Sequence, residues 1–174
     1  MKKARKMEIQ DINNIGLILS QRFPFQQFVI EIFRKTNVFL NKHNTLIDIY
    51  KNMYPGLNNT KESLLFGQLC GFIIYCFENI YSPNENLADM NNDIIDYWGK
   101  ITMDNLFQKT RMQENFGSGY NLLRASSLQP ILLDYVLSPY LGNVDNEIPN
   151  IDKRIDFILT LHTFINILGK YYYD

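Results

Sequence analysis

The chain has 174 residues, which fits one domain or at most two small ones, and 46% of the residues are hydrophobic and 14% aromatic. This composition supports a sizeable core and excludes an intrinsically disordered chain, which would be poor in apolar and aromatic residues. The formal net charge of −1 is small and argues for neither a strongly basic nor a strongly acidic protein.

The charged residues are unevenly distributed along the chain. Four of the basic residues, Lys2, Lys3, Arg5 and Lys6, lie at the N-terminus, which leaves 13 basic and 18 acidic residues in the rest of the sequence. A mildly acidic body lacks the basic patch or stripe that binds nucleic acid, so no nucleic-acid partner is expected. We predict that residues 1–7 form a basic, flexible tip.

The two cysteines and the start of the chain indicate a cytoplasmic protein. Cys70 and Cys76 are separated by about 600° around a helix, so their thiols are expected on different faces, buried and reduced. The basic N-terminus is followed by polar residues, whereas a signal peptide would continue with an apolar segment. The longest apolar run, 64–77, is shorter than the roughly 20 residues that span a bilayer, so we expect a core helix and no membrane partner.

Hydrophobic spacing predicts helices along nearly the whole chain. Apolar residues recur every three or four positions, and the alternating patterns typical of strands are scarce. In chain order, we expect helices at about 8–22, 24–41, 45–53, 60–81, 87–112, 120–128, 130–138 and 151–172. Because no repeat, linker or change of composition divides the sequence, these helices are predicted to form a single all-α domain over residues 1–174, a compact bundle of seven or eight helices.

Three local signals refine this pattern. Gly67 and Gly71, four residues apart in an apolar helix, are expected to let a second helix cross close to the backbone. The Phe-Gly-Ser-Gly string at 116–119 is expected to interrupt the helical pattern. Pro130 is expected either to divide the stretch 120–141 into two helices or to kink a single one.

No group of residues has the sequence spacing of a catalytic or metal-binding site. His162 lies on the apolar stripe of the last helix, where a partly buried histidine with one hydrogen bond is expected, and His43 lies at a helix end. Ser126 and Ser127 have no histidine or lysine nearby in sequence to suggest a nucleophilic triad. The acidic loop before the last helix lacks the central glycine of an EF-hand. We therefore expect no enzymatic activity, no metal and no cofactor.

The fifth helix carries an acidic strip. Asp89, Asp93 and Asp96 fall on one face of this helix, and the opposite, apolar face includes Trp98. Aspartates at this spacing repel one another, and an ordinary solvated helix face is the alternative to a surface that attracts a cationic protein. The residues expected to contact such a partner are Asp89, Asp93, Asp96 and Asp104, together with Asp145 and Glu147 of the acidic loop.

A four-residue string around the single tryptophan resembles a known family. Tyr97-Trp98-Gly99-Lys100 is similar to the Asn-Trp-Gly-Arg core of the first homology region of the Bcl-2 family, with Tyr97 and Lys100 in place of the asparagine and the arginine. No second homology motif follows, and no functional residue is carried over. The resemblance implies a helical module that holds an amphipathic helix in an apolar groove near Trp98 and Gly99.

Elimination of the other classes favours a small helical protein that works by binding another protein. We expect an immunity or antitoxin-type inhibitor that occludes a basic toxin, such as a nuclease, in the cytoplasm, and that is a monomer or a weak homodimer. One alternative is the helix-binding groove of the Bcl-2 type. The other is a ligand-sensing bundle, which would need an internal apolar cavity lined by some of the Phe and Tyr residues.

Overall fold

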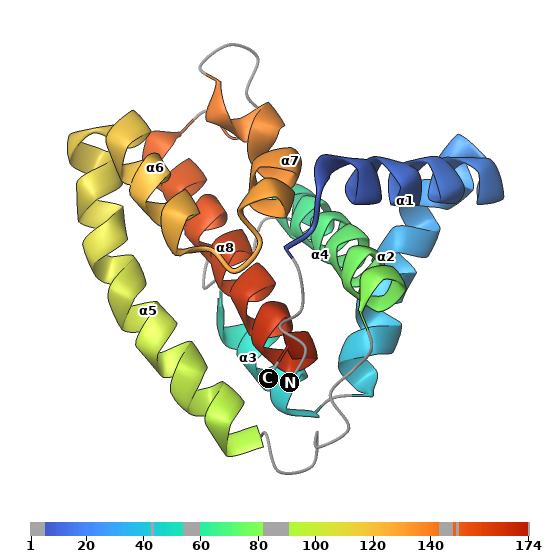
Figure 1. Cartoon of the computed structure of the whole chain (residues 1–174), viewed down its shortest axis with the longest axis horizontal. Helices are drawn as coiled ribbons and strands as arrows, with labels where there is room; N and C mark the ends of the chain where they lie inside the picture. Colours follow the sequence, from blue (N-terminus) through green and yellow to red (C-terminus); the bar gives the residue numbers. More distant parts are fainter. Residues whose placement is uncertain are drawn as a thin grey trace.

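The described part of the chain is helical, as the hydrophobic spacing predicts. The structure is a computed structural model that describes residues 6–42, 44–53, 60–81, 91–142, 148 and 150–173. These residues form eight α-helices and no strand (Figure 1). In chain order they are α1 Ile9–Arg22, α2 Phe25–Asn41, α3 Asn44–Met53, α4 Thr60–Ile80, α5 Asn91–Glu114, α6 Phe116–Ser126, α7 Pro130–Leu141 and α8 Ile151–Tyr173.

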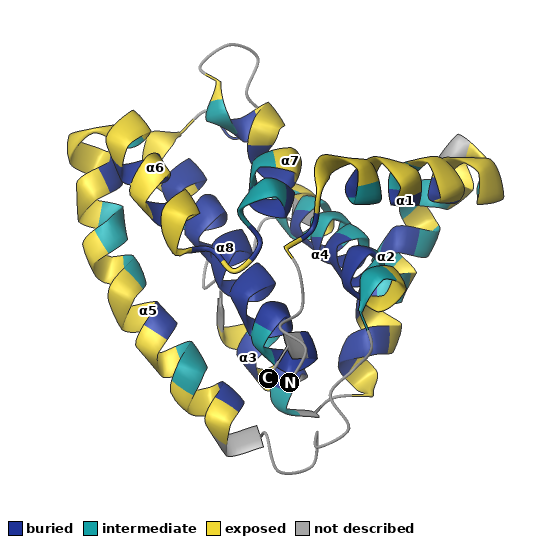
Figure 2. Cartoon of the chain, viewed as in Figure 1, coloured by how far each residue is buried: buried dark blue, intermediate teal, exposed yellow. Residues whose placement is uncertain are grey.

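The helix α8 lies at the centre of the bundle. It contacts α4, α5 and α7, and in Figure 1 it runs between α5 and α6 on one side and α4 and α2 on the other. Every residue from 154 to 169 is buried except Asp156, so neighbouring helices surround α8 on nearly all sides (Figure 2). Its side chains are accordingly apolar around most of its circumference, which is the pattern of a fully buried helix.

Buried polar side chains on α8 find partners in their own helix and in the adjoining chain. The hydroxyls of Thr160 and Thr163 donate to backbone carbonyls one turn earlier. The Asn166 amide oxygen accepts from the backbone N–H of Leu128, at 2.7 Å, in the connection between α6 and α7. These bonds remove the cost of burying polar groups and fix α8 against that connection.

Two glycines in α4 let α2 cross close to its backbone, as their spacing predicts. A Cβ on Gly67 would come within 2.5 Å of the Phe33 ring, and one on Gly71 would lie 2.0 Å from the backbone oxygen of Ile32. At this crossing the hydroxyl of Thr36 donates to the Gly67 carbonyl at 2.7 Å. The absence of side chains at the two glycines therefore sets the separation of α2 and α4.

The Phe-Gly-Ser-Gly string does not interrupt the helical pattern, contrary to prediction. It forms the first turn of α6, because Asn115 caps that helix by accepting from the backbone N–H of Ser118 at 2.9 Å. A Cβ on Gly119 would meet the backbone of Met112 at 2.7 Å. The glycine thus allows α6 to fold back against the end of α5, and the break in helical structure falls at Asn115.

Pro130 divides the following stretch into two helices, the first of the two predicted outcomes. It occupies the first turn of α7, where a missing N–H costs nothing. The helix continues past Pro139 to Leu141, further than predicted. The loss of one backbone bond at Pro139 is offset because the Ser138 hydroxyl donates to the carbonyl of Tyr135 at 3.1 Å.

The N-terminal segment joins the fold at Met7. Of the predicted tip, residues 1–5 lie outside the described residues and Lys6 is exposed. Met7 is fully buried, and its backbone N–H donates to the side-chain oxygen of Gln129 at 2.8 Å. The Gln129 amide nitrogen in turn donates to the hydroxyl of Tyr81 at 3.2 Å, so this buried side chain joins three segments.

The helix α4 is long and apolar enough, by length and composition alone, to cross a membrane. Its residues Lys61–Ile80 have a mean hydropathy of 1.4, and 44% of this apolar segment is buried. A core helix passes the same test, and α4 contacts α1, α2 and α8. Cys70 and Cys76 on this helix are free thiols and buried, as predicted, and burial raises the pKa of both.

Candidate functional site

The inner face of α5 packs into the bundle and leaves most of the helix exposed. Ile94, Ile101 and Met112 are buried, Trp98 is half-buried, and α5 contacts α3, α6 and α8. Its orientation relative to α8 is antiparallel, because Asn105 bonds to Thr163 near the middle of both helices, whereas Gln113 near the end of α5 bonds to Asp152 near the start of α8. The apolar face predicted for this helix is confirmed at its described positions.

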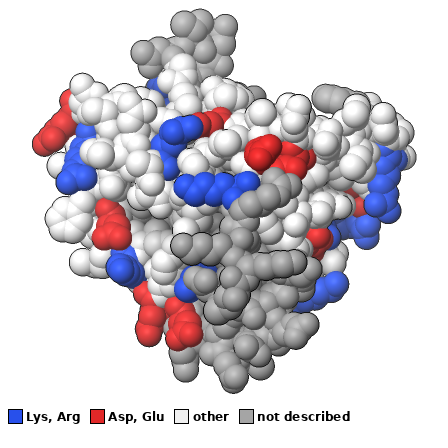
Figure 3. Space-filling model, in the orientation of Figure 1, with Lys and Arg blue, Asp and Glu red and all other residues white. Residues whose placement is uncertain are grey.

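Three of the aspartates predicted to bind a partner are exposed on α5. Asp93, Asp96 and Asp104 lie along one side of the helix, as their spacing predicts, and Lys100 lies between them. Figure 3 shows acidic and basic side chains alternating along the edge of the molecule where α5 lies. The strip is therefore acidic on balance but not continuously so.

The other predicted partner-binding residues are not placed beside these three. Asp89, Asp145 and Glu147 lie outside the described residues. Asp152, the first acidic residue after the predicted loop that is described, accepts a hydrogen bond from Gln113 at 2.8 Å. That position is about 30 Å along α5 from Asp93, from the rise of 1.5 Å per residue. Asp152 is thus at the opposite end of the helix from Asp93.

Exposed apolar side chains accompany the aspartates on α5, and the sequence analysis missed them. Met103 is 59% exposed, Leu106 59% and Phe107 67%. Leu106 and Phe107 follow Met103 by three and four residues, so the three side chains form a patch that points away from the buried face. The signal was present in the spacing, since these residues lie opposite Ile94 and Ile101. We call the exposed set Asp93, Asp96, Lys100, Met103, Asp104, Leu106 and Phe107 the outer face of α5.

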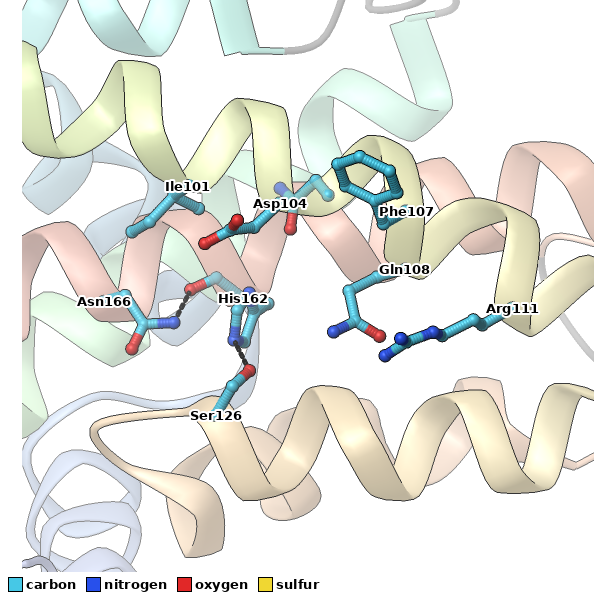
Figure 4. Close-up of a pocket in the computed structure, with 9 residues that line it drawn as sticks. Ile101, Asp104, Phe107, Gln108, Arg111, Ser126, His162 and Asn166 are labelled. Atoms are coloured by element: carbon cyan, nitrogen blue, oxygen red, sulfur yellow. Dashed lines mark hydrogen bonds between the residues drawn. The ribbon is translucent and has the colours of Figure 1, made fainter.

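A polar pocket lies between α5, α6 and α8. Its volume is about 280 Å³. Figure 4 shows Gln108 and Arg111 of α5 extending into the same space as Ser126, at the end of α6, and His162 of α8. The lining residues are Ile101, Asp104, Asn105, Phe107, Gln108, Arg111, Ser126, His162 and Asn166. Sequence reasoning could not find this pocket, because its residues come from three separate stretches of the chain.

The structure brings together a serine and a histidine that are 36 residues apart. Ser126 Oγ lies 3.3 Å from His162 Nε2 (Figure 4). The Ser126 hydroxyl donates its hydrogen to the carbonyl of Leu123 at 2.7 Å, so its oxygen accepts from His162. This arrangement fits the imidazole tautomer that carries its hydrogen on Nε2. Burial lowers the pKa of His162 to about 4, and the ring is neutral at physiological pH.

This pair lacks the geometry of a nucleophilic triad. A catalytic histidine must accept the serine proton, whereas here the serine hydroxyl donates to the carbonyl of Leu123. A triad also needs an acid on the second ring nitrogen, and His162 Nδ1 has no hydrogen-bond partner among the described residues. No group of three His, Cys, Asp or Glu side chains in the described part of the chain could hold a metal ion.

Three buried polar atoms of pocket residues have no hydrogen-bond partner: Asn105 Oδ1, Gln108 Oε1 and His162 Nδ1. The network fixes two of them as acceptors. The Thr163 hydroxyl donates to the carbonyl of Leu159, so its oxygen accepts from the Asn105 amide nitrogen at 2.7 Å. The Asn105 atom without a partner is therefore the amide oxygen, which is an acceptor. In the tautomer with the ring hydrogen on Nε2, His162 Nδ1 is an acceptor as well. The pocket thus offers lone pairs to a donor.

An apolar groove of about 290 Å³ lies elsewhere, between α2, α4 and α7. Phe28, Leu69, Phe72 and Tyr135 are among the residues that line it. The Bcl-2 resemblance implied a groove near Trp98 and Gly99, and neither residue lines this one. Gly99 is exposed, and a Cβ there would touch nothing within 4 Å, so no close helix packing requires this glycine.

The geometry defines an all-helical bundle with an exposed apolar and acidic helix face and a polar pocket beneath that helix. Comparison of the chain with known protein families, with curated proteins and with solved structures finds no match.

Proposed function

We propose that this protein is a non-enzymatic inhibitor of the immunity or antitoxin type, which binds a basic protein and occludes it with the outer face of α5. The observation that carries the proposal is the exposure of Met103, Leu106 and Phe107 beside Asp96 and Asp104. Apolar side chains surrounded by polar ones are characteristic of surfaces that bind other proteins.

The two kinds of side chain have different roles in this proposal. The apolar residues supply the area that loses water on binding, and Phe107 is the most exposed of them. The three aspartates attract a cationic partner from a distance and fix its orientation, since rim charges act mainly on association rate and specificity. One lysine, Lys100, among three aspartates leaves this surface negative.

The proposed partner is a basic toxin, such as a nuclease whose positive surface serves to bind nucleic acid. Occlusion requires no chemistry in the inhibitor, so the proposal includes no cofactor, metal, nucleic acid or membrane. We place the complex in the cytoplasm and propose that the free inhibitor is a monomer or a weak homodimer.

The test compares what each purified, tagged variant captures from the native cytosol, measured by quantitative mass spectrometry. Asp93→Lys combined with Asp96→Lys reverses two exposed charges and touches no buried residue. Capture of a basic, stoichiometric partner should fall at least about tenfold, because like charges placed opposite each other cost several kcal/mol. Helicity measured by circular dichroism should stay unchanged.

A second pair of variants separates the outer face of α5 from exposed apolar surface in general. Met103→Ala with Phe107→Ala should also lose the partner. The matched control is Leu17→Ala with Ile18→Ala on α1, where the side chains are 56% and 57% exposed. If the control loses the partner while both α5 variants keep it, the proposed surface is wrong.

A further inference from the structure

The pocket between α5, α6 and α8 has the properties of a built ligand site. His162 at its wall is 5% exposed and fixed through Nε2 to Ser126, so its unpaired Nδ1 cannot turn toward bulk water. Asn105 is held in the same way by Thr163. A buried acceptor without a donor is unfavourable, and both of these acceptors belong to residues that line one cavity.

The acceptors at this end of the pocket call for a donor with several hydrogens. The carboxylate of Asp104 adds a negative charge to the lining, and in Figure 4 this side chain points toward His162. An ammonium or guanidinium group carries three to five donors and no acceptor, so it matches this set of lone pairs. The low pKa of His162, about 4, keeps the imidazole uncharged and available as an acceptor.

The other end of the pocket carries the opposite charge. Arg111 lines it, and Figure 4 shows its side chain extending into the pocket so that the guanidinium lies beside Gln108. The two residues are seven positions apart on α5, which is about 10 Å along the helix axis. Arg111 would repel a simple cation but would pair with a carboxylate at the far end of the same ligand.

We propose that this pocket binds a small zwitterion of the amino-acid type, with its ammonium or guanidinium group against Asp104, Asn105 and His162 and its carboxylate against Arg111. The volume of about 280 Å³ lies just below the range for ligand pockets, which runs from about 300 to 1,000 Å³. This size suits an amino acid better than a nucleotide or a lipid. The inference does not rest on the proposed protein partner, although Asp104 and Phe107 belong to both the pocket lining and the outer face of α5.

The experiment measures binding of defined probes to the full chain by isothermal titration and by the shift in melting temperature. L-arginine and L-lysine at millimolar concentration should bind saturably and raise the melting temperature. Agmatine, which is arginine without the carboxylate, should bind about tenfold more weakly, because it loses a charge-assisted bond to Arg111. Acetate, which lacks the cation, should not bind.

Three pocket variants test where the probes bind. Gln108→Leu removes an acceptor at nearly constant size, Asp104→Asn removes the charge at one end, and Arg111→Gln removes it at the other. Each substitution should lower the affinity for L-arginine about tenfold or more. The control is Asp48→Asn, an exposed aspartate on α3 that does not line the pocket.

The proposal is overturned if neither amino acid binds, as expected of a cavity that holds only water, or if binding survives Gln108→Leu and Asp104→Asn. Equal affinity for agmatine and arginine would overturn the role given to Arg111. Two variants keep this test apart from that of the protein partner. Gln108→Leu lies outside the outer face of α5, and Met103→Ala lies outside the pocket. Gln108→Leu should weaken only the binding of the amino acid, and Met103→Ala should weaken only the binding of the protein partner.

Discussion

Among the glycines that the structure describes, Gly71 is the one at which an added Cβ would come closest to another atom. A Cβ at this position would overlap the backbone oxygen of Ile32, at 2.0 Å, and a backbone atom cannot move aside as a flexible side chain can. We predict that Gly71→Ala lowers the free energy of unfolding by about 2–3 kcal/mol, the upper part of the range for overpacking. Urea denaturation followed by circular dichroism measures this change.

The matched control for Gly71→Ala is Gly99→Ala, in the middle of α5. A Cβ there meets nothing within 4 Å, so only the helix propensity changes. Alanine should stabilise the protein by about 0.5–1 kcal/mol, because glycine loses more conformational entropy in a helix. If both substitutions had the same effect, the close crossing of α2 and α4 would not be what makes Gly71 necessary.

His162 should make stability depend on pH. Its pKa is lowered by burial to about 4, whereas in the unfolded chain it is about 6.5. Between these values the unfolded chain binds the proton and the folded protein does not, so the contribution is complete above about pH 6.5 and is lost as pH falls toward 4. The loss should be of the order of 3 kcal/mol.

Carboxylates also titrate near pH 4, so the effect of His162 is obtained by comparing the parent protein with a variant that lacks this histidine. His162→Gln keeps a polar side chain but removes the group that titrates in this range. Between neutral pH and pH 4, the free energy of unfolding of this variant should fall less than that of the parent protein. Equal slopes for the two proteins would show that the histidine does not lose its proton on folding. Urea denaturation at a series of pH values measures both curves.

Among the helices, α6 depends most clearly on a single cap. The Asn115 side chain accepts from the backbone N–H of Ser118, and without it that donor has no partner in the first turn. Asn115→Ala should therefore cost about 1 kcal/mol of unfolding free energy, measured by urea denaturation. Asn121→Ala, at an exposed position inside the same helix, should be neutral or slightly stabilising.

The same helix shows where sequence reasoning about elements failed. Two glycines and a serine within 116–119 suggested a break, because each is unfavourable inside a helix. The packing of Gly119 against the backbone of Met112 outweighs that preference, and this contact involves tertiary structure that no local pattern reveals. Helix positions elsewhere followed from hydrophobic spacing, which depends only on residues close together in the chain.

The helix α5 shows a similar limit for the candidate site. Spacing placed Asp93 and Asp96 on one face of the helix, and the structure exposes both of them together with Asp104. The prediction was based on the charged residues and did not include Met103 and Phe107, which lie on the solvent side of the same helix. An apolar residue on a helix can face either the core or a partner, and only the positions of α6 and α8 distinguish the two.

At the scale of the whole molecule, stability should be greatest along α8. Its residues from 154 to 169 are buried with one exception, whereas α1 exposes more than half of its positions. In hydrogen exchange at neutral pH, the amides of α8 should exchange only through global unfolding, and those of α1 should exchange faster. Equal protection of the two helices would mean that the bundle opens only as a unit.

The sequence predicted that the protein is all-helical, but it did not predict how the helices pack against one another. The apolar circumference of α8 predicts a buried helix, but it does not say which helices cover it. The contact between Ser126 and His162 illustrates the difficulty, because it joins side chains 36 residues apart and depends on the turn at Pro130 and on the position of Asn166 together. No sequence signal available to us predicts such a pair.

The central position of α8 has a consequence for synthesis of the protein in the cell. Translation proceeds from the N-terminus, so α1 to α7 leave the ribosome before the helix around which they pack. Until α8 emerges, the apolar surfaces of α4, α5 and α7 that it will cover have no partner and are open to association with other chains. A nascent chain stalled before residue 151 should therefore bind chaperones strongly, and it should release them once α8 is complete.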